Sequence, residues 1–138
     1  MTDPFCDTSI LIRLITGDDL AKQERAIALF ERVEQRAASL AAPDTVIADA
    51  VFVLTSRRLY GMPRHEAAAR LTTLVKLPNF HVRNRQAVLG ALHLFGTTAT
   101  LDFGDCMLVA MMQQSGEQRL YAYDLDFDRV PGIIRQEP

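Results

Sequence analysis

The sequence predicts an α/β fold in which a central, mainly parallel sheet of four to five short strands lies between layers of helices. Short strand-like segments alternate with longer segments that carry a helical apolar repeat along the 138 residues. Such alternation implies right-handed crossovers and a parallel sheet that is covered on both faces. No repeat, low-complexity tract or long linker interrupts the pattern. We therefore expect residues 1–138 to form a single domain.

The first half of the chain begins with a strand and then alternates helices with a second strand. We expect a strand at 4–7, a helix at about 8–15, a long surface helix at 17–37, a strand at 39–42 and a helix at 44–58. Asp18 or Asp19 is a suitable cap for the long helix, which has an apolar stripe through Phe30. The helix at 44–58 is apolar almost all round at its start, which predicts burial.

The second half of the chain continues the same alternation. We expect a helix from Pro63, a strand at 79–82, a helix around 88–95, a helix at 101–116, a strand at 119–123 and an edge strand at 132–136. Val88, Leu92 and Phe95 belong to an i, i+4, i+7 stripe that is typical of an amphipathic helix. Asp102 and Gly116 are the residue types expected at the start and the end of the helix at 101–116.

The composition is that of an ordinary globular protein, with 49% hydrophobic residues, 23% charged residues and a net charge of −2. This charge does not by itself indicate a nucleic-acid-binding protein. The N-terminal MTDPF is acidic and unlike a signal peptide, and no apolar stretch approaches the roughly 18 residues that a membrane span needs. We expect a cytoplasmic protein without a membrane partner, in which Cys6 and Cys106 are buried and reduced.

Four aspartates lie next to strongly apolar segments, where an uncompensated charge is costly. Asp7 precedes TSILIRLI, Asp49 lies within VIADAVFVL, Asp105 precedes CMLVAMM, and Asp124 follows RLYAY. In parallel α/β folds ligands bind at the carboxyl ends of the strands. Since Asp7 and Asp124 each end a predicted strand, we expect both at the same rim of the sheet.

The type of these residues predicts the chemistry of the site. A single acid is usually a helix cap or half of an ion pair, and Asp102 is the best candidate for a plain cap. Four acids without a matching set of basic residues are better explained by a divalent cation, and all-oxygen ligands favour Mg²⁺ or Mn²⁺ over zinc. Carboxylate-held Mg²⁺ lowers the pKa of bound water and stabilises phosphoryl charge, so phosphodiester hydrolysis is the reaction class that we expect.

Four blocks of the sequence together resemble the PIN domain family, and most closely its VapC-type toxins from bacterial type II toxin–antitoxin systems. The blocks are CDTSILIRLITGDD, APDTVIADAVFVLTSRRLYG, LDFGDCMLVAMM and LYAYDLDFDRVPG, and they occur in the family's order over nearly the whole chain. The resemblance implies a three-layer α/β/α domain, usually a homodimer, that cleaves RNA with Mg²⁺ or Mn²⁺.

The resemblance also assigns the residues of the site by position. The four acidic ligands fall on Asp7, Asp49, Asp105 and Asp124. Supporting roles fall on the small polar Ser9 and on Arg13, which would order the acids or contact phosphate. Independently of the resemblance, Asp102 shares a helical face with Asp105, and Asp126 follows Asp124 closely enough to be expected near the metal.

Two departures from the family pattern leave a second function open. The second acid is usually glutamate, whereas Asp49 is one methylene shorter, and Ala122 replaces a common Ser or Thr. The alternative is a PIN module with a decayed nuclease site that acts as a dimeric antitoxin-binding and autoregulatory protein. A haloacid-dehalogenase phosphatase, suggested by the pair Asp124 and Asp126, is disfavoured because that pair would follow the first strand. A receiver domain is disfavoured because no late lysine is present.

The partners follow from the resemblance. They are an RNA substrate, a VapB-type antitoxin that docks on an apolar groove and inserts a basic residue into the acidic pocket, and a second copy of the chain. DNA would be contacted only through the antitoxin. Arg57 and Arg58 are further candidates for contacts to the substrate strand.

Overall fold

The computed structural model describes residues 2–138, which form six α-helices, one 3₁₀ helix and four short strands. The helices are α1 (Thr8–Ile15), α2 (Leu20–Glu34), α3 (Asp44–Thr55), α4 (Arg64–Val75), α5 (Arg85–Thr97), α6 (Phe103–Ser115) and the 3₁₀ helix η1 (Leu125–Arg129). The strands are β1 (Leu40–Ala42), β2 (Phe80–Val82), β3 (Arg119–Tyr121) and β4 (Ile134–Gln136). The predicted α/β class and the order of elements are confirmed.

All strand pairing is parallel, but the strands form two separate pairs. β1 pairs with β2, and the predicted first strand is reduced to one bridge between Phe5 and Ala41. β3 pairs with β4, with Arg119 opposite Ile134. Between residues 2 and 138 the structure therefore contains two two-stranded sheets where the sequence predicts one continuous sheet.

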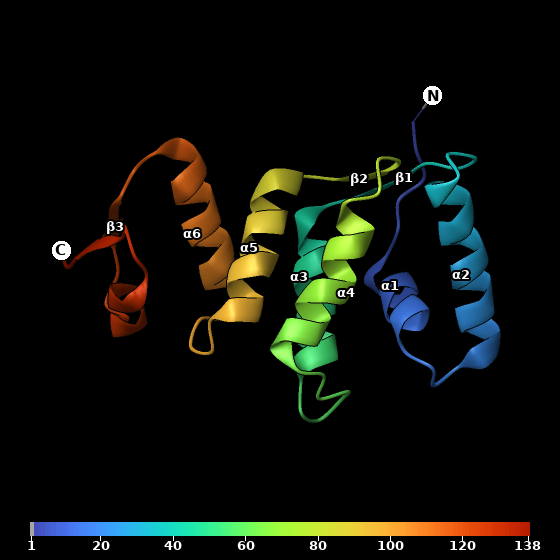
Figure 1. The fold of residues 1–138 in the computed structure, drawn as a ribbon, viewed down its shortest axis with the longest axis horizontal. Coiled ribbons are helices and arrows are strands. Elements are labelled where there is room, and N and C mark those ends of the chain that lie inside the picture. Colours follow the sequence, from blue (N-terminus) through green and yellow to red (C-terminus); the bar gives the residue numbers. More distant parts are fainter. Residues whose placement is uncertain (1) are drawn as a thin grey trace.

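The order of the helices explains this division. Figure 1 shows α1 and α2 on one side of the molecule, α3, α4 and α5 in the middle, and α6 with the β3–β4 pair on the other side. Only residues 116–118 connect α6 to β3, and three residues span about 10 Å at most. Because α6 packs on the outer side of α5, β3 cannot reach the strand at Phe5 in this arrangement.

A continuous apolar core joins the two ends. Phe30 of α2 meets Phe80 of β2 edge to face, with ring centroids 5.4 Å apart. Phe95 of α5 meets Phe103 of α6 in the same way at 6.1 Å. Such pairs add to the free energy gained from burial, so they fix α2 to the first strand pair and α6 to the central helices.

The polar residues that the sequence places at helix ends occupy those positions. The Asp19 carboxylate accepts from the Lys22 amide at the start of α2, and the Asp102 carboxylate accepts from the Asp105 amide at the start of α6. Gly116 ends α6 with φ of 79°, a left-handed conformation that glycine adopts at little cost.

α4 and α5 pack closely against each other at Gly96 of α5. A Cβ on Gly96 would lie 3.1 Å from the Ala68 side chain, so glycine is needed for this contact. The Arg64 guanidinium covers the Phe95 ring at 3.7 Å and donates to the carbonyl of Phe95. It also donates to the Leu101 carbonyl, which holds the loop between α5 and α6 in place.

None of the helices between residues 2 and 138 combines the length and the apolar character required to span a bilayer.

Candidate metal centre

Asp7 lies at the end of the N-terminal extended segment, directly before α1. Its side chain is exposed, and the Ser9 hydroxyl donates to its Oδ2 at 2.9 Å. This hydrogen bond, followed by one from the Thr8 backbone, holds the pKa of Asp7 below its usual value. Ser9 thus orients the first predicted ligand and favours its ionised form, which is a specific form of the supporting role that the sequence suggests.

Asp49 lies on a face of α3 that is open to solvent. Thr45, Asp49 and Phe52 follow one another along this face, and the Phe52 side chain is 70% exposed. The prediction that the start of α3 is buried all round is wrong on this side, although Ile47, Ala50 and Leu54 are fully buried as expected.

Asp7 and Asp49 lie on neighbouring helices. α1 packs against α3, and the Thr8 hydroxyl donates to the Val46 carbonyl at 3.4 Å. We call Asp7 and Asp49 the N-terminal half-site.

Asp105 is half-buried in the first turn of α6. Burial raises its pKa above the usual value, and the negative charges of Asp102 and Asp124 raise it further. We call Asp102, Asp105 and Asp124 the C-terminal half-site. Its carboxylates repel one another, and the Arg64 guanidinium, which lines the same cavity as Asp102, offsets part of this negative charge.

Asp124 follows β3 and begins η1. Its Oδ1 accepts from the Asp126 backbone amide at 2.9 Å, so Asp126 contributes its backbone to the position of Asp124. The Arg135 guanidinium of β4 donates to the Ala122 carbonyl at 3.0 Å and to Asp128 Oδ1 at 2.9 Å. Arg135 therefore fixes the turn from which the Asp124 carboxylate projects, a role that no local pattern in the sequence indicates.

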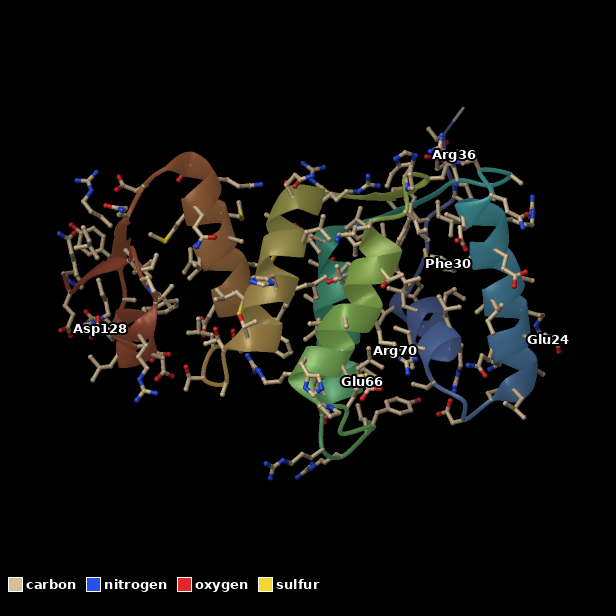
Figure 2. The ribbon with its side chains drawn as sticks, in the orientation of Figure 1. Glu24, Phe30, Arg36, Glu66, Arg70 and Asp128 are labelled. Carbon is tan, nitrogen blue, oxygen red and sulfur yellow. The ribbon has the colours of Figure 1, made fainter. Side chains whose placement is uncertain are left out.

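Asp7 and Asp124 are apart in one chain, whereas α3, which carries Asp49, contacts α6, and Phe52 of α3 lines a cavity of about 320 Å³ together with Asp102. α1 and η1 lie on opposite sides of the molecule with α3, α4 and α5 between them (Figure 1). The η1 residue Asp128 is likewise far from Phe30 and Glu24 of α2 (Figure 2). Within residues 2–138 no three His, Cys, Asp or Glu side chains are grouped closely enough to hold a metal ion. The expectation that Asp7 and Asp124 share one rim is not met within a single copy.

Arg13 contacts a different acid from those of the predicted site. Its guanidinium donates to Asp18 Oδ1 at 2.9 Å, and the Tyr60 hydroxyl donates to Asp18 Oδ2 at 2.6 Å. The bonds from Tyr60 and Thr16, together with Arg13, lower the pKa of Asp18. The contact between Asp18 and Tyr60 joins residues 42 positions apart, so local sequence patterns carry no sign of it.

A basic groove adjoins the N-terminal half-site. It has a volume of about 410 Å³ between α1 and α2, and Ser9, Arg13, Lys22 and Arg25 line it with three apolar side chains. Ser9 also bonds Asp7, so the groove leads directly to the first predicted ligand.

Cys6 and Cys106 are buried and free, as predicted. Burial raises the pKa of each thiol to about 11, so both are unreactive at neutral pH.

Comparison with known families identifies the domain. The family model described as PIN domain matches residues 5–133, a range that contains both half-sites. The chain is a PIN domain. PIN domains are generally nucleases and commonly depend on divalent metal ions, in agreement with the class of chemistry predicted from the aspartates. No curated protein matches the chain.

The side chains of the two half-sites fit a hard divalent cation. All of the predicted ligands are carboxylates, and oxygen ligands of this kind suit Mg²⁺ or Mn²⁺. Burial, and after it the negative charge of Asp102, raises the pKa of Asp105, so a bound cation would favour its ionised form. The carboxylates of the predicted ligands are therefore donors of the kind that such a metal prefers.

Proposed function

We propose that this PIN domain is a metal-dependent endoribonuclease whose site consists of Asp7, Asp49, Asp105 and Asp124. The observation that carries the proposal is the C-terminal half-site, where the half-buried Asp105 lies close to Asp102 and Asp124, and burial and then their charges raise its pKa. A fold that brings like charges together at a cost in stability is typical of a functional site rather than of a structural one.

The residues of the chain have separable tasks in this proposal. Asp105 and Asp124, with Asp7 and Asp49, hold Mg²⁺ or Mn²⁺, which supplies charge stabilisation and activation of water when bound. Ser9 holds the Asp7 carboxylate in place through its hydrogen bond to Oδ2. Arg135 fixes the turn that carries Asp124.

The basic groove between α1 and α2 is the candidate path of the RNA strand. Lys22 and Arg25 offer cations to phosphates, while Asp18 holds the Arg13 guanidinium at the edge of the groove. A strand bound there would reach Asp7 through Ser9. The contacts are of the backbone type, so we do not assign a sequence preference to them.

We further propose that the enzyme acts as a VapC-type toxin that a VapB-type antitoxin neutralises. The support is the order of the four sequence blocks and the cluster of acids at the C-terminal half-site. A basic side chain from the antitoxin would take the place of the cation there and lower the repulsion between Asp105 and Asp124.

A second candidate is a binding module whose nuclease site has decayed. Two observations favour it. Asp49 is shorter than the usual glutamate and makes no side-chain hydrogen bond among residues 2–138, and a single chain does not bring the four acids together. A decayed site would not bind Mn²⁺ measurably.

The test is cleavage of a labelled total-RNA pool by purified protein with Mg²⁺, with Mn²⁺ and with EDTA. We expect discrete cuts that require metal and that decrease by roughly 100-fold or more in Asp7→Asn and Asp105→Asn. The matched control is Asp3→Asn, which changes an acid outside both half-sites and is expected to leave cleavage unchanged. Well-folded wild-type protein that never cleaves with metal would reject the enzyme and favour the binding module.

A further inference from the structure

A cavity of about 320 Å³ lies between the second half of α3, the start of α4, the end of α5 and the start of α6, and we call it the α3–α6 cavity. These helix ends lie on the same side of the molecule (Figure 1). Three aromatic and two oppositely charged side chains are among those that line it: Phe52, Phe95, Phe103, Arg64 and Asp102. Small-molecule sites have volumes of roughly 300–1,000 Å³. The α3–α6 cavity therefore suits a single ring system rather than a helix or a folded partner.

The aromatic side chains form an inner wall and a mouth. Phe95 and Phe103 are buried and meet edge to face, so they close the cavity on the inside. Phe52 lines the same cavity but is 70% exposed, which means that the cavity opens to solvent beside this ring. Single-stranded nucleic acids are recognised through bases that stack on exposed aromatic side chains of this kind.

The two charged side chains of the cavity retain hydrogen-bonding groups for a ligand. Arg64 uses Nε and Nη2 to donate to the carbonyls of Phe95 and Leu101, while Nη1 has no partner among residues 2–138. Asp102 uses Oδ1 to accept from the Asp105 amide at 2.8 Å, while Oδ2 accepts from no group in the described part of the chain. No ion pair joins Arg64 and Asp102 within residues 2–138. The cavity thus offers a ligand a cationic donor and an anionic acceptor.

The α3–α6 cavity adjoins two of the proposed metal ligands. Phe52 lies one helical turn after Asp49 on the exposed face of α3. On the other side, the hydrogen bond from the Asp105 amide ties Asp102 to the first turn of α6. A ring in the cavity therefore lies between the helices that carry Asp49 and Asp105. If the ring is a nucleobase, its own ribose and phosphate extend toward these acids.

We propose that the α3–α6 cavity binds a guanine of the RNA strand, next to the bond that the enzyme cleaves. Phe52 stacks on the base, Asp102 accepts from its N1–H and N2–H₂ groups, and Arg64 donates to O6. Guanine is the base that fits, because adenine, cytosine and uracil each offer a carboxylate only one donor group. The inference rests on the proposed function for the role of the strand, whereas the binding of guanine requires neither metal nor cleavage.

The chain contains no tryptophan, so Phe52→Trp places a single fluorescent reporter at the mouth of the cavity. The variant is titrated in EDTA with guanosine, adenosine, cytidine and uridine, which carry no phosphate for the acids to repel. We expect saturable quenching, with guanosine binding roughly 10-fold more tightly than the other three nucleosides. The control is Leu59→Trp, at an exposed position outside the cavity, which should show only linear, collisional quenching.

The contact to Asp102 is tested by adding Asp102→Asn to the Phe52→Trp protein. Asparagine is as good a helix cap as aspartate, so the start of α6 is kept. Its amide cannot accept from both donors of guanine, and we expect guanosine affinity to fall by roughly 10-fold while adenosine affinity stays the same. Asp19→Asn makes the same change at the cap of α2, outside the cavity, and should leave guanosine affinity unchanged.

Three results would overturn the proposal. One is quenching of the Phe52→Trp protein that does not exceed that of Leu59→Trp. Another is equal affinity for the four nucleosides, and the third is the same guanosine affinity in the Asp102→Asn and Asp19→Asn proteins. None of these measurements involves RNA cleavage. Selective guanosine binding by a protein that never cleaves RNA would leave the cavity assigned and reject the nuclease.

Cleavage of the labelled RNA pool gives a separate readout. We expect the wild-type cuts to lie at a fixed distance from a guanine, and Phe52→Ala to lower the rate at these positions by roughly 10-fold because the stacked base is lost. Leu59→Ala, a change of the same kind outside the cavity, should leave the rate unchanged. Metal-dependent cuts without a common guanine would overturn this inference and leave the proposed nuclease intact.

Discussion

Asp105 is the residue whose ionisation the fold makes most unfavourable among the four proposed ligands. Its raised pKa means that the native state holds this proton more tightly than the unfolded chain does. Stability therefore falls as the pH rises through the folded-state pKa, and the ionised form is destabilising at neutral pH.

We predict that Asp105→Asn raises the melting temperature at pH 7 in EDTA. The difference should disappear in acid, where both states of the wild type are protonated. Added Mn²⁺ should stabilise the wild type and not the variant. Glu24→Gln, an exposed change on α2, is the control, and an Asp105→Asn protein that melts at or below the wild-type temperature at pH 7 would contradict the account.

Arg135 is the positioning residue for Asp124. Its side chain is only 13% exposed and bonds both Ala122 and Asp128. We predict that Arg135→Ala weakens Mn²⁺ binding by roughly 10-fold, as is usual when the residues that support a metal ligand are removed. Arg135→Lys should recover part of the affinity. The control is Arg119→Ala on β3, the strand that pairs with β4. It removes an exposed ion pair between Arg119 and Glu117 and should leave Mn²⁺ binding unchanged.

At the scale of elements, the contact between α4 and α5 depends on the absence of a side chain at Gly96. We predict that Gly96→Ala destabilises the protein by about 1–2 kcal/mol, because its Cβ would meet Ala68 at 3.1 Å. Gly90→Ala is the matched change on the same helix, with its nearest contact at 3.4 Å, and should be neutral or stabilising because alanine favours the helix. Equal effects in urea unfolding would refute the close approach.

The groove between α1 and α2 gives the second prediction at this scale. Arg25→Glu should raise KM for RNA by roughly 10-fold and reduce its dependence on salt, because one phosphate contact is lost. kcat should change little. The matched control is Arg36→Glu, which makes the same charge change beyond the end of α2 and away from the groove (Figure 2). If the two variants have the same KM, the strand follows another path.

The identity of the elements was predictable because it depends on local signals. Asp19, Asp102 and Gly116 mark helix ends through contacts with residues three or four positions away. The continuity of the sheet was not predictable in this way. Whether β3 pairs with the Phe5 segment or only with β4 depends on where α6 docks on α5, and that contact involves no strand residue.

At the scale of the whole molecule, the same distinction applies to the site. The four acids were identified from their residue type and their apolar neighbours. The separation of Asp7 from Asp124 was not, because it follows from the helices α4 and α5 that lie between α1 and η1 (Figure 1). Arg135 and Asp18 were missed since their partners come from distant segments.

We propose that Asp7 and Asp105 act at one metal centre although they lie in different half-sites. Titration of purified protein with Mn²⁺ by calorimetry tests it most directly. We predict saturable binding by the wild type and at least a roughly 10-fold loss of affinity in both Asp7→Asn and Asp105→Asn, with Asp3→Asn unchanged. Binding that survives either substitution, or no binding by the folded wild type, would contradict the claim.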